Sequence, residues 1–475
     1  MVFTSLTFIA FAAIFFPLFF LSRGRLQTIV LLIGSYIFYG WWDWRFLGLL
    51  LTSTVVDYTL GRCIARSETE AVRRVWLTFS VTANLGFLGF FKYFNFFADS
   101  FTGVLRTFGM QADWATLHIV LPVGISFYTF QSMSYTIDVY RRRIEPERDF
   151  LTFASFIALF PQLVAGPIVR ATTLLPQMHG TKRFRWVNLF VGLEMVVTGF
   201  FMKLVVADNL APFVNHVFDL PEAYNSATLL TGSVFFAFQI YGDFAGYSLI
   251  AIGLGRVMGY RFCRNFRRPY FAASFSDFWT RWHISLSSWL RDYLYISLGG
   301  NRFGTYRTYR NLMTTMLLGG LWHGANWTFI VWGALHGFYL VMQRVLSAGM
   351  KKLGLGGAVA SPVGYVISVF AVFTLTTVAW VFFRAENFTQ AWTILERIVA
   401  LGDFHLAELP LKFQVVKGVV LIALLLSVEA AAELRPVRAG FRSTRWVRSA
   451  AVLAMLWAVS LVGSFSGEQF IYFQF

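Results

Sequence analysis

The sequence is poor in charge and in cysteine. Only 13% of its 475 residues are charged, whereas 57% are hydrophobic, a balance outside that of a soluble globular protein with an ordinary surface. Cys63 and Cys263 are the only cysteines, so there is neither a disulfide framework nor a CxxC metal motif. A soluble enzyme and a disulfide-stapled secreted domain are both disfavoured, and a membrane protein is the first interpretation.

Several catalytic motifs are missing as well. The chain has no GxSxG elbow, no HExxH and no GxxxxGK[ST], and its 7 histidines show no metal-ligand spacing. A covalent serine hydrolase, a zinc enzyme and an ATP-driven pump are therefore unsupported, and no metal is expected. The net charge of +16 resides in short basic clusters between apolar runs, which is typical of membrane loops and predicts no nucleic-acid partner.

Long apolar runs are what the chain has in abundance. A bilayer takes roughly 20 apolar residues to cross. Runs of this kind cover 2–21, 75–91, 187–207, 228–254, 363–383, 414–432 and 446–463. They are dispersed over the whole chain, which leaves no room for a sizeable soluble domain. We therefore predict an all-α polytopic membrane protein with a single integral-membrane domain over 1–475, whose first run is a retained helix rather than a cleaved signal.

Basic clusters predict which loops face the cytoplasm. The stretch 256–310 carries ten arginines and is placed inside, whereas 208–227 has no lysine or arginine and is placed outside. Arg23 and Arg25 inside put the N-terminus outside. The arginines of 435–448 form a last inner loop, so the C-terminus is also expected outside.

Two apolar segments are interrupted by helix breakers. Residues 311–343 contain five glycines, which predicts a broken or re-entrant pair of helices. Residues 159–168 contain Pro161, Gly166 and Pro167. Irregular backbone at membrane depth is tolerated only where protein buries it or a wet cavity faces it.

One histidine lies in a segment with helical periodicity. Residues 275–294, FSDFWTRWHISLSSWLRDYL, place aromatic and apolar side chains on one face and polar ones on the other. The pattern predicts one amphipathic helix, with His283 at the edge of its apolar arc. From there His283 can point into a protein-lined chamber; the alternative is an interfacial histidine that hydrogen-bonds locally.

A second histidine, His323, lies within GLWHGANW (320–327), in the glycine-rich segment. An ionisable group at membrane depth is costly and indicates function; the alternative is a neutral imidazole bonded to a backbone carbonyl. His336 is interpreted as structural or supporting. A neutral imidazole can take the proton of a hydroxyl that attacks a thioester, which is general-base acyl transfer. Asp243, in another apolar run, orients a histidine or arginine partner or satisfies buried backbone donors.

These residues lie in motifs that resemble the membrane-bound O-acyltransferase family, in its bacterial branch typified by alginate O-acetyltransferase. The resemblance runs from about residue 30 to the C-terminus. Its strongest pieces are FPQLVAGPIVR (160–170), KLVVADNLA (203–211), IYGDFAGYSLIAIGLG (240–255), NFRRPYFAASFSDFWTRWHISLSSWLRDYLYISLGGNRFG (265–304) and LLGGLWHGANWTFIVWGALHG (317–337). Leu249 and Ser297 depart from the family pattern, where relatives usually carry Asp and Pro.

The resemblance implies a ring of transmembrane helices with re-entrant segments around a central tunnel, with a core over about 118–345. The family's hallmark histidine falls on His323 and that of its RWH segment on His283, which makes these two the expected catalytic residues. The expected tunnel-lining or substrate-contacting residues are Trp322, Asn326, Asp243 and Arg281.

The function implied is transfer of acetyl from a cytosolic thioester, acetyl-CoA, to an extracytoplasmic polysaccharide such as alginate, without a tightly bound cofactor. The implied location is the bacterial inner membrane, in contact with lipid and beside a periplasmic acetyltransferase partner. Two alternatives stay open. One is D-alanyl transfer to teichoic acid from a carrier protein, and the other is a transporter of polysaccharide or lipid precursors.

Overall fold

The computed structural model describes residues 1–110, 117, 119–164, 166–353, 361–433, 445–465, 470 and 471. Within these residues the chain forms helices joined by turns and loops, with no strand, which confirms the all-α prediction. The chain divides into two compact units, one of residues 1–196 with 250–263 and the other of residues 197–249 with 264–475. The helix α12, Ser226–Met258, passes from the second unit into the first.

The first unit is a set of helices of unequal length. They are α1 (Leu6–Leu21), α2 (Gly24–Gly40), α3 (Arg45–Arg66), α4 (Glu70–Leu88), η1 (Gly89–Tyr93), α5 (Phe94–Thr107), α6 (Ile125–Tyr140), α7 (Phe150–Ala158), α8 (Phe160–Leu163), α9 (Ala171–Met178) and the greater part of α10 (Trp186–Phe200). The predicted interruption at 159–168 is confirmed, because α8 has only four residues. A Cβ on Gly166 would lie 2.4 Å from the Cα of Gln162, so only glycine fits there.

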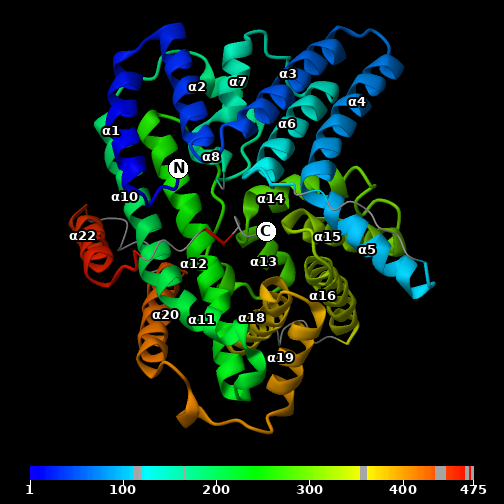
Figure 1. Ribbon diagram of the computed structural model, residues 1–475, viewed down its shortest axis with the longest axis vertical. Helices are drawn as coiled ribbons and strands as arrows, with labels where there is room; N and C mark the ends of the chain where they lie inside the picture. Colours follow the sequence, from blue (N-terminus) through cyan, green and yellow to red (C-terminus); the bar gives the residue numbers. More distant parts are fainter. Residues whose placement is uncertain are drawn as a thin grey trace. The chain divides into compact units, whose positions relative to one another are not determined.

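A buried carboxylate links three helices of this unit. The helices α3, α4 and α6 run side by side (Figure 1). Asp57 on α3 is fully buried and accepts hydrogen bonds from Ser80 Oγ at 2.6 Å, from Asn84 Nδ2 at 2.8 Å and from Ser132 Oγ. Because a buried carboxylate is costly without donors, these three bonds select one arrangement of the three helices.

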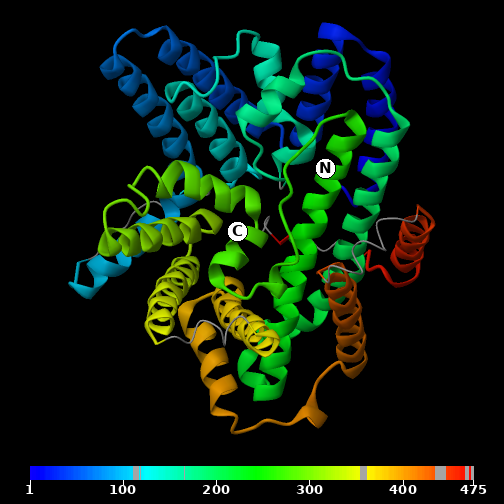
Figure 2. The same ribbon diagram turned by 180° about the vertical axis from the view of Figure 1, so that it is seen from behind.

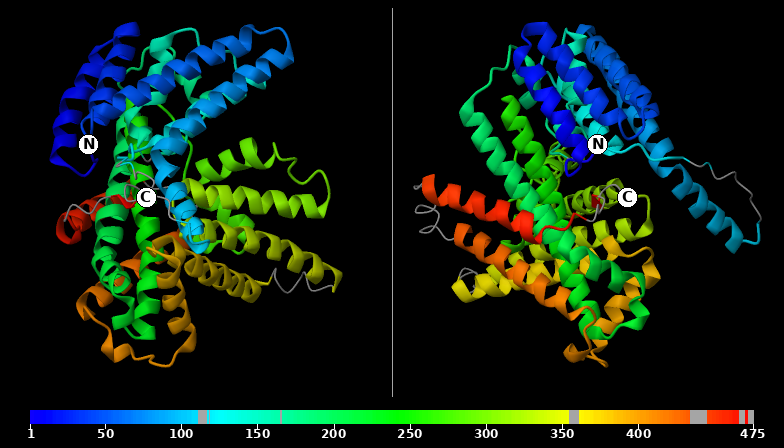
Figure 3. Two further views of the ribbon diagram at one scale, coloured as in Figure 1. Left: turned by 45° about the vertical axis from the view of Figure 1, so that its right-hand side comes forward. Right: turned by 60° about the vertical axis from the view of Figure 1, so that its left-hand side comes forward.

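The second unit contains the remaining helices. They are η2 (Phe201–Ala207), α11 (Asp208–Asp219), η3 (Pro221–Ala223), most of α12, η4 (Pro269–Phe271), α13 (Phe275–Arg281), α14 (Ile284–Trp289), η5 (Leu290–Tyr295), α15 (Thr305–His323), α16 (Trp327–Lys352), α18 (Pro362–Arg384), α19 (Phe388–Ala400), η6 (Leu406–Glu408), α20 (Lys412–Glu433) and α22 (Arg445–Val462). The helix α20 packs on α11 and η2, and α22 packs on η2 (Figure 3).

The predicted break in 311–343 is confirmed as an antiparallel pair, α15 and α16, with the turn after His323 (Figure 2). Glycines set the distance between the two helices. A Cβ on Gly320 would lie 2.2 Å from the carbonyl oxygen of Phe329, and one on Gly333 would lie 2.4 Å from that of Met316. Small residues at such a crossing let helix backbones approach closely. The glycines around His323 therefore serve helix packing.

In the part of the chain that the structure describes, five helices are long and apolar enough to cross a membrane. They are Trp186–Asp219, Ser226–Met258, Trp327–Lys352, Pro362–Arg384 and Lys412–Glu433, with two shorter apolar helices at Leu6–Leu21 and Trp446–Val462. The runs expected at 187–207, 228–254, 363–383 and 414–432 all fall within them. The run at 75–91 falls in α4 and η1, outside these five spans. The chain is a multi-pass membrane protein, and residues 434–444 of the last predicted inner loop lie outside the described residues.

The Asp57 network generates a stability prediction. Asp57→Ala removes the shared acceptor of three buried donors, and each such loss costs about 1–3 kcal/mol. We expect a clear fall in the thermal unfolding temperature of the detergent-solubilised protein, and a smaller fall for Asp57→Asn, which keeps one acceptor oxygen. An Asp57→Ala protein as stable as the parent would show that the network does not hold these helices.

Candidate functional site

The segment expected to be one amphipathic helix is broken at His283. The helix α13 begins after its N-cap Ser274 and ends at Arg281, and α14 begins at Ile284. Between them His283 has φ 40°, in the left-handed region that non-glycine residues seldom adopt. The prediction of a continuous helix over 275–294 is wrong, because periodicity cannot register a hydrogen-bond network that breaks the helix at one residue.

The side chain of Asn265 forms that network. Its Oδ1 accepts from His283 Nδ1 at 3.0 Å, from the backbone N–H of Ser285 at 3.2 Å and from Ser285 Oγ at 2.9 Å. Its Nδ2 donates to Ser248 Oγ at 3.0 Å, and its backbone carbonyl accepts from Ile284 N at 2.8 Å. Since a backbone N–H can only donate, the oxygen of Asn265 faces this way. The Nδ1 of His283 therefore carries the proton and Nε2 carries the lone pair.

Burial keeps the His283 imidazole neutral. The side chain is fully buried, and this burial lowers its pKa from 6.5 to about 3. A neutral imidazole with its lone pair on Nε2 accepts a proton or a hydrogen bond from a hydroxyl. His283 is thus buried by protein and hydrogen-bonded to Asn265, and its expected place in a substrate chamber stays a prediction.

His323 comes to the same place from α15, 40 residues further along the chain. It is 4% exposed, and its ring centroid lies 6.4 Å from that of His283. Trp322, 3% exposed, has its ring 5.9 Å from that of His283. Trp332 packs edge-on at 4.9 Å from His323, and Phe383 at 5.4 Å. The two expected catalytic histidines thus form one buried centre with aromatic walls.

The ring of Trp332 packs against both His323 and His336. The imidazole of His336 is fully buried 4.7 Å from the ring of Trp332, and it packs on Phe278 and Trp279. Among the described residues neither of its ring nitrogens has a hydrogen-bond partner. It belongs to the aromatic wall behind His323, which agrees with a supporting place.

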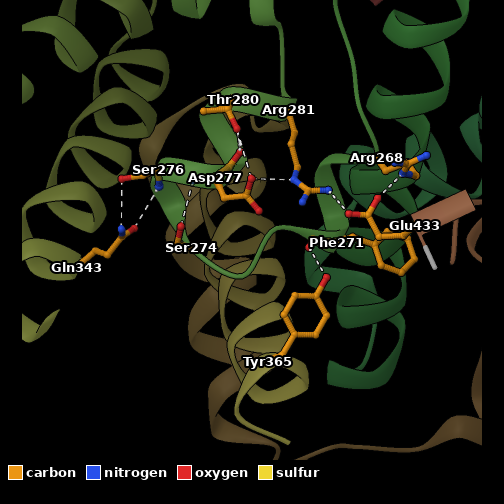
Figure 4. Close-up of polar contacts among 10 residues, drawn as sticks. All are labelled: Arg268, Phe271, Ser274, Ser276, Asp277, Thr280, Arg281, Gln343, Tyr365 and Glu433. Carbon is orange, nitrogen blue, oxygen red and sulfur yellow. Dashed lines mark hydrogen bonds and ion pairs between the residues drawn. The ribbon is translucent and has the colours of Figure 1, made fainter. Parts of the chain in front are cut away.

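Ion pairs hold the chain that leads into His283 (Figure 4). Arg281 Nε lies 2.8 Å from Asp277 Oδ1, and its guanidinium lies 3.1 Å from Glu433 Oε1. Glu433 also receives Arg268 Nε at 2.6 Å. Glu433, the last residue of α20, thus fixes two arginines of this segment, and Arg281 is engaged in this network. Its expected substrate contact stays a prediction.

Asn326 and Asp243 bind groups other than the two imidazoles. Asn326 is the N-cap of α16, accepts from Thr328 N at 3.0 Å and donates to the carbonyl of Glu386 at 2.8 Å, so both polar atoms of its side chain are engaged there. Asp243 is buried on α12, where it pairs with Lys203 at 2.7 Å. Its ionic partner is therefore a lysine rather than a histidine or arginine. The other alternative, that it satisfies a buried backbone donor, is confirmed, because its Oδ2 accepts from the N–H of Ile471 at 2.7 Å.

Sequence reasoning missed Asn265 and Lys203. Lys203 is the single cation within an apolar run of more than a dozen residues, and an ionisable residue in such a run is itself a signal. Asn265 gives no comparable signal, because its loop is rich in arginine and aromatic residues. Only the folded chain shows what its amide binds.

Neutral burial of His283 generates a pH prediction. The unfolded state binds a proton below pH 6.5, whereas the folded state binds it only near the pKa of about 3. Folding stability is therefore lost as pH falls below 6.5, by up to about 1.4 kcal/mol per pH unit. We expect the detergent-solubilised protein to lose more thermal stability between pH 7 and pH 5 than a His283→Asn variant, which cannot titrate. An equal loss in both proteins would contradict neutral burial.

Comparison with known proteins finds a matching family and several similar proteins. Residues 36–383 match the model of the MBOAT, membrane-bound O-acyltransferase family. The chain is 45% identical over 413 residues to a protein of Azotobacter vinelandii named "Probable alginate O-acetylase AlgI", covering 86% of this chain and 80% of the relative. The protein of that name in Pseudomonas aeruginosa is 46% identical, with 86% and 77% covered. The peptidoglycan O-acetyltransferase of Helicobacter pylori is 36% identical over 405 residues, with 80% and 75% covered.

The family match extends over most of the chain and includes the segments that carry His283 and His323. The two buried imidazoles therefore both lie within the residues that match the family, and their expected catalytic role stays a prediction. This chain belongs to the membrane-bound O-acyltransferase family and is an acyltransferase.

Proposed function

We propose that the protein is an O-acetyltransferase that takes acetyl from a cytosolic thioester, acetyl-CoA, for O-acetylation of an extracytoplasmic polysaccharide such as alginate. The observation that carries this proposal is the buried pair of His283 and His323, whose rings lie 6.4 Å apart. The relatives named O-acetylase, at 45% and 46% identity, support acetyl as the group transferred.

The proposed chemistry is direct transfer with His323 as general base. Its imidazole takes the proton of the acceptor hydroxyl while the hydroxyl oxygen attacks the thioester carbonyl carbon. The new C–O bond forms, the C–S bond breaks, and the departing thiolate takes up the proton from the imidazolium. His283, held by Asn265, orients donor or acceptor through Nε2 or shares the proton. Trp322 and Trp332 exclude water from the thioester, because their rings close the sides of His323.

The proposal places the protein in the bacterial inner membrane with both termini in the periplasm. Its support is the charge pattern, with ten arginines in 256–310 and no lysine or arginine in 208–227. A periplasmic acetyltransferase is the proposed partner that completes transfer to the polymer.

Loss of the His323 imidazole tests the chemistry. General acid–base groups contribute roughly 10²–10⁴-fold to a rate, so His323→Ala should lower polymer acetylation at least 100-fold at normal membrane abundance. The measurement is acetate released by base from the isolated polymer. His405→Ala, which removes an exposed histidine of the same unit, should acetylate like the parent. If His323→Ala also acetylates like the parent, the proposal fails.

The donor is tested with purified protein in liposomes. Labelled acetyl-CoA should lose its acetyl group and release free thiol only with wild-type protein, and a D-alanyl carrier protein should not be consumed. Loss of D-alanine from the charged carrier protein, without loss of acetyl from acetyl-CoA, would instead favour teichoic acid D-alanylation. Movement of a precursor across the liposome with no covalent change, retained in His323→Ala, would favour a transporter.

Orientation is tested by labelling single cysteines in a chain with Cys63→Ala and Cys263→Ala. Arg302 and Glu222 are both exposed, one in the arginine-rich stretch and one in the acidic stretch. A membrane-impermeant maleimide should label Arg302→Cys only in inverted vesicles and Glu222→Cys only in intact spheroplasts. The reverse pattern would overturn the proposed orientation.

A further inference from the structure

The helix α12 carries two neighbouring rows of side chains, each with residues four apart. Phe244 and Ser248 form the first row, which faces the histidine centre. The ring of Phe244 lies edge-on 4.6 Å from that of His283, and Ser248 accepts from Asn265. Asp243 and Tyr247 form the second row, one position earlier on the helix.

The second row binds the chain at residues 470 and 471. Asp243 Oδ2 accepts from the backbone N–H of Ile471 at 2.7 Å. The ring of Phe470 stacks on Tyr247 with centroids 4.5 Å apart, and it lies 5.8 Å from Phe244. Phe470 is fully buried and Ile471 is 5% exposed. The ring of Phe244 therefore contacts both Phe470 and the imidazole of His283.

The other oxygen of Asp243 belongs to a buried group of three charges. Lys203 Nζ lies 2.7 Å from Asp243 Oδ1 and 2.7 Å from Asp208 Oδ1, and each of the three side chains is 6% exposed or less. One ammonium and two carboxylates thus share a site within apolar helices. The ammonium fixes one oxygen of Asp243, so the other is aimed at the N–H of Ile471 as a charge-assisted acceptor.

Two glycines make this group possible. Gly242 and Gly246 lie on α12 where η2 crosses it. A Cβ on Gly246 would lie 2.7 Å from the carbonyl oxygen of Gly199 and 2.9 Å from the backbone nitrogen of Lys203, and one on Gly242 would lie 2.9 Å from the carbonyl of Met202. The absence of these side chains lets η2 approach closely enough for Lys203 to reach Asp243.

A contribution to folding stability does not by itself explain this buried group of charges. Each of these three buried charges costs several kcal/mol to desolvate, and packed apolar side chains of similar volume are often as stable. Ionisable residues in membrane helices typically serve function. The geometry indicates a function for Asp243. The carboxylate oxygen that does not face Lys203 accepts a hydrogen bond from the backbone of Ile471, next to the histidine centre.

We propose that Asp243 is a positioning residue for acyl transfer. Oriented by Lys203 and Asp208, it holds residues 470 and 471 on Tyr247, and Phe470 in turn backs the ring of Phe244 that packs on His283. This segment is thereby a wall of the transfer centre. The inference rests on the proposed function of the two histidines.

The first test measures whether Asp243 seats the segment, independently of activity. In a chain with Cys63→Ala and Cys263→Ala, Phe470→Cys should react slowly with a maleimide. Adding Asp243→Asn, which removes one negative charge beside Lys203, should speed the reaction at least 10-fold. Adding Asp243→Glu, which keeps the charge, should restore most of the slow rate. Equal rates with Asp243 and Asp243→Asn would overturn the inference.

The second test measures whether seating matters for transfer. With labelled acetyl-CoA, Asp243→Asn should lower kcat at least 10-fold and leave the donor KM within about twofold, because the segment positions His283 and does not bind the donor. A chain ended after Phe465 keeps all three charged side chains and should lose kcat to the same extent. Asp243→Asn in that shortened chain should then add little, since coupled changes are not additive. Full activity of the shortened chain, or an additive loss, would overturn the inference.

A control separates this inference from the proposed function. His323→Ala should lose transfer while Phe470→Cys in the same chain still reacts slowly. If His323→Ala keeps full transfer, the proposed function fails, whereas the labelling contrast between Asp243 and Asp243→Asn still decides whether this carboxylate seats the segment.

Discussion

The amide oxygen of Asn265 is the atom on which the histidine centre depends. It accepts from His283, from the Ser285 hydroxyl and from the Ser285 backbone, and it sets both the tautomer of the imidazole and the turn that carries it. A left-handed backbone at His283 costs energy, and three hydrogen bonds to one buried oxygen compensate for it. Hydrogen bonds to that oxygen thus stabilise the break between α13 and α14.

Close approach of two helix backbones positions the second histidine, His323. The glycines of α15 and α16 bring the two helices into contact and end the first of them at His323. The aromatic rings of Trp322, Trp332 and Phe383 then fill the space around the imidazole. The same device recurs at Gly242 and Gly246 on α12, where close approach allows a buried ion pair. Small residues in this protein thus place polar groups where apolar packing alone would exclude them.

The relation between sequence and site differs from residue to residue. His283 and His323 stand out because imidazoles are rare in apolar segments, and their proposed function rests on that rarity and on the surrounding motifs. Arg281 and Asn326 lie in the same motifs and were expected to contact substrate as well. In the folded chain Arg281 pairs with Asp277 and Glu433, and Asn326 caps the start of α16. Periodicity also favoured one helix over 275–294, because it reads the spacing of apolar side chains and is blind to a hydrogen-bonded break that keeps that spacing.

Composition and the length of the apolar runs determined that the chain is an all-helical, multi-pass membrane protein, because a bilayer core accepts only backbones that satisfy their own hydrogen bonds. Glycine and histidine motifs determined which segments carry the centre. Only the tertiary structure decided that His283 and His323 meet, that Asn265 fixes the tautomer, and that Lys203, Asp243 and Ile471 come together. Those contacts join residues from 18 to more than 200 positions apart, and no local pattern encodes the distance between two such side chains.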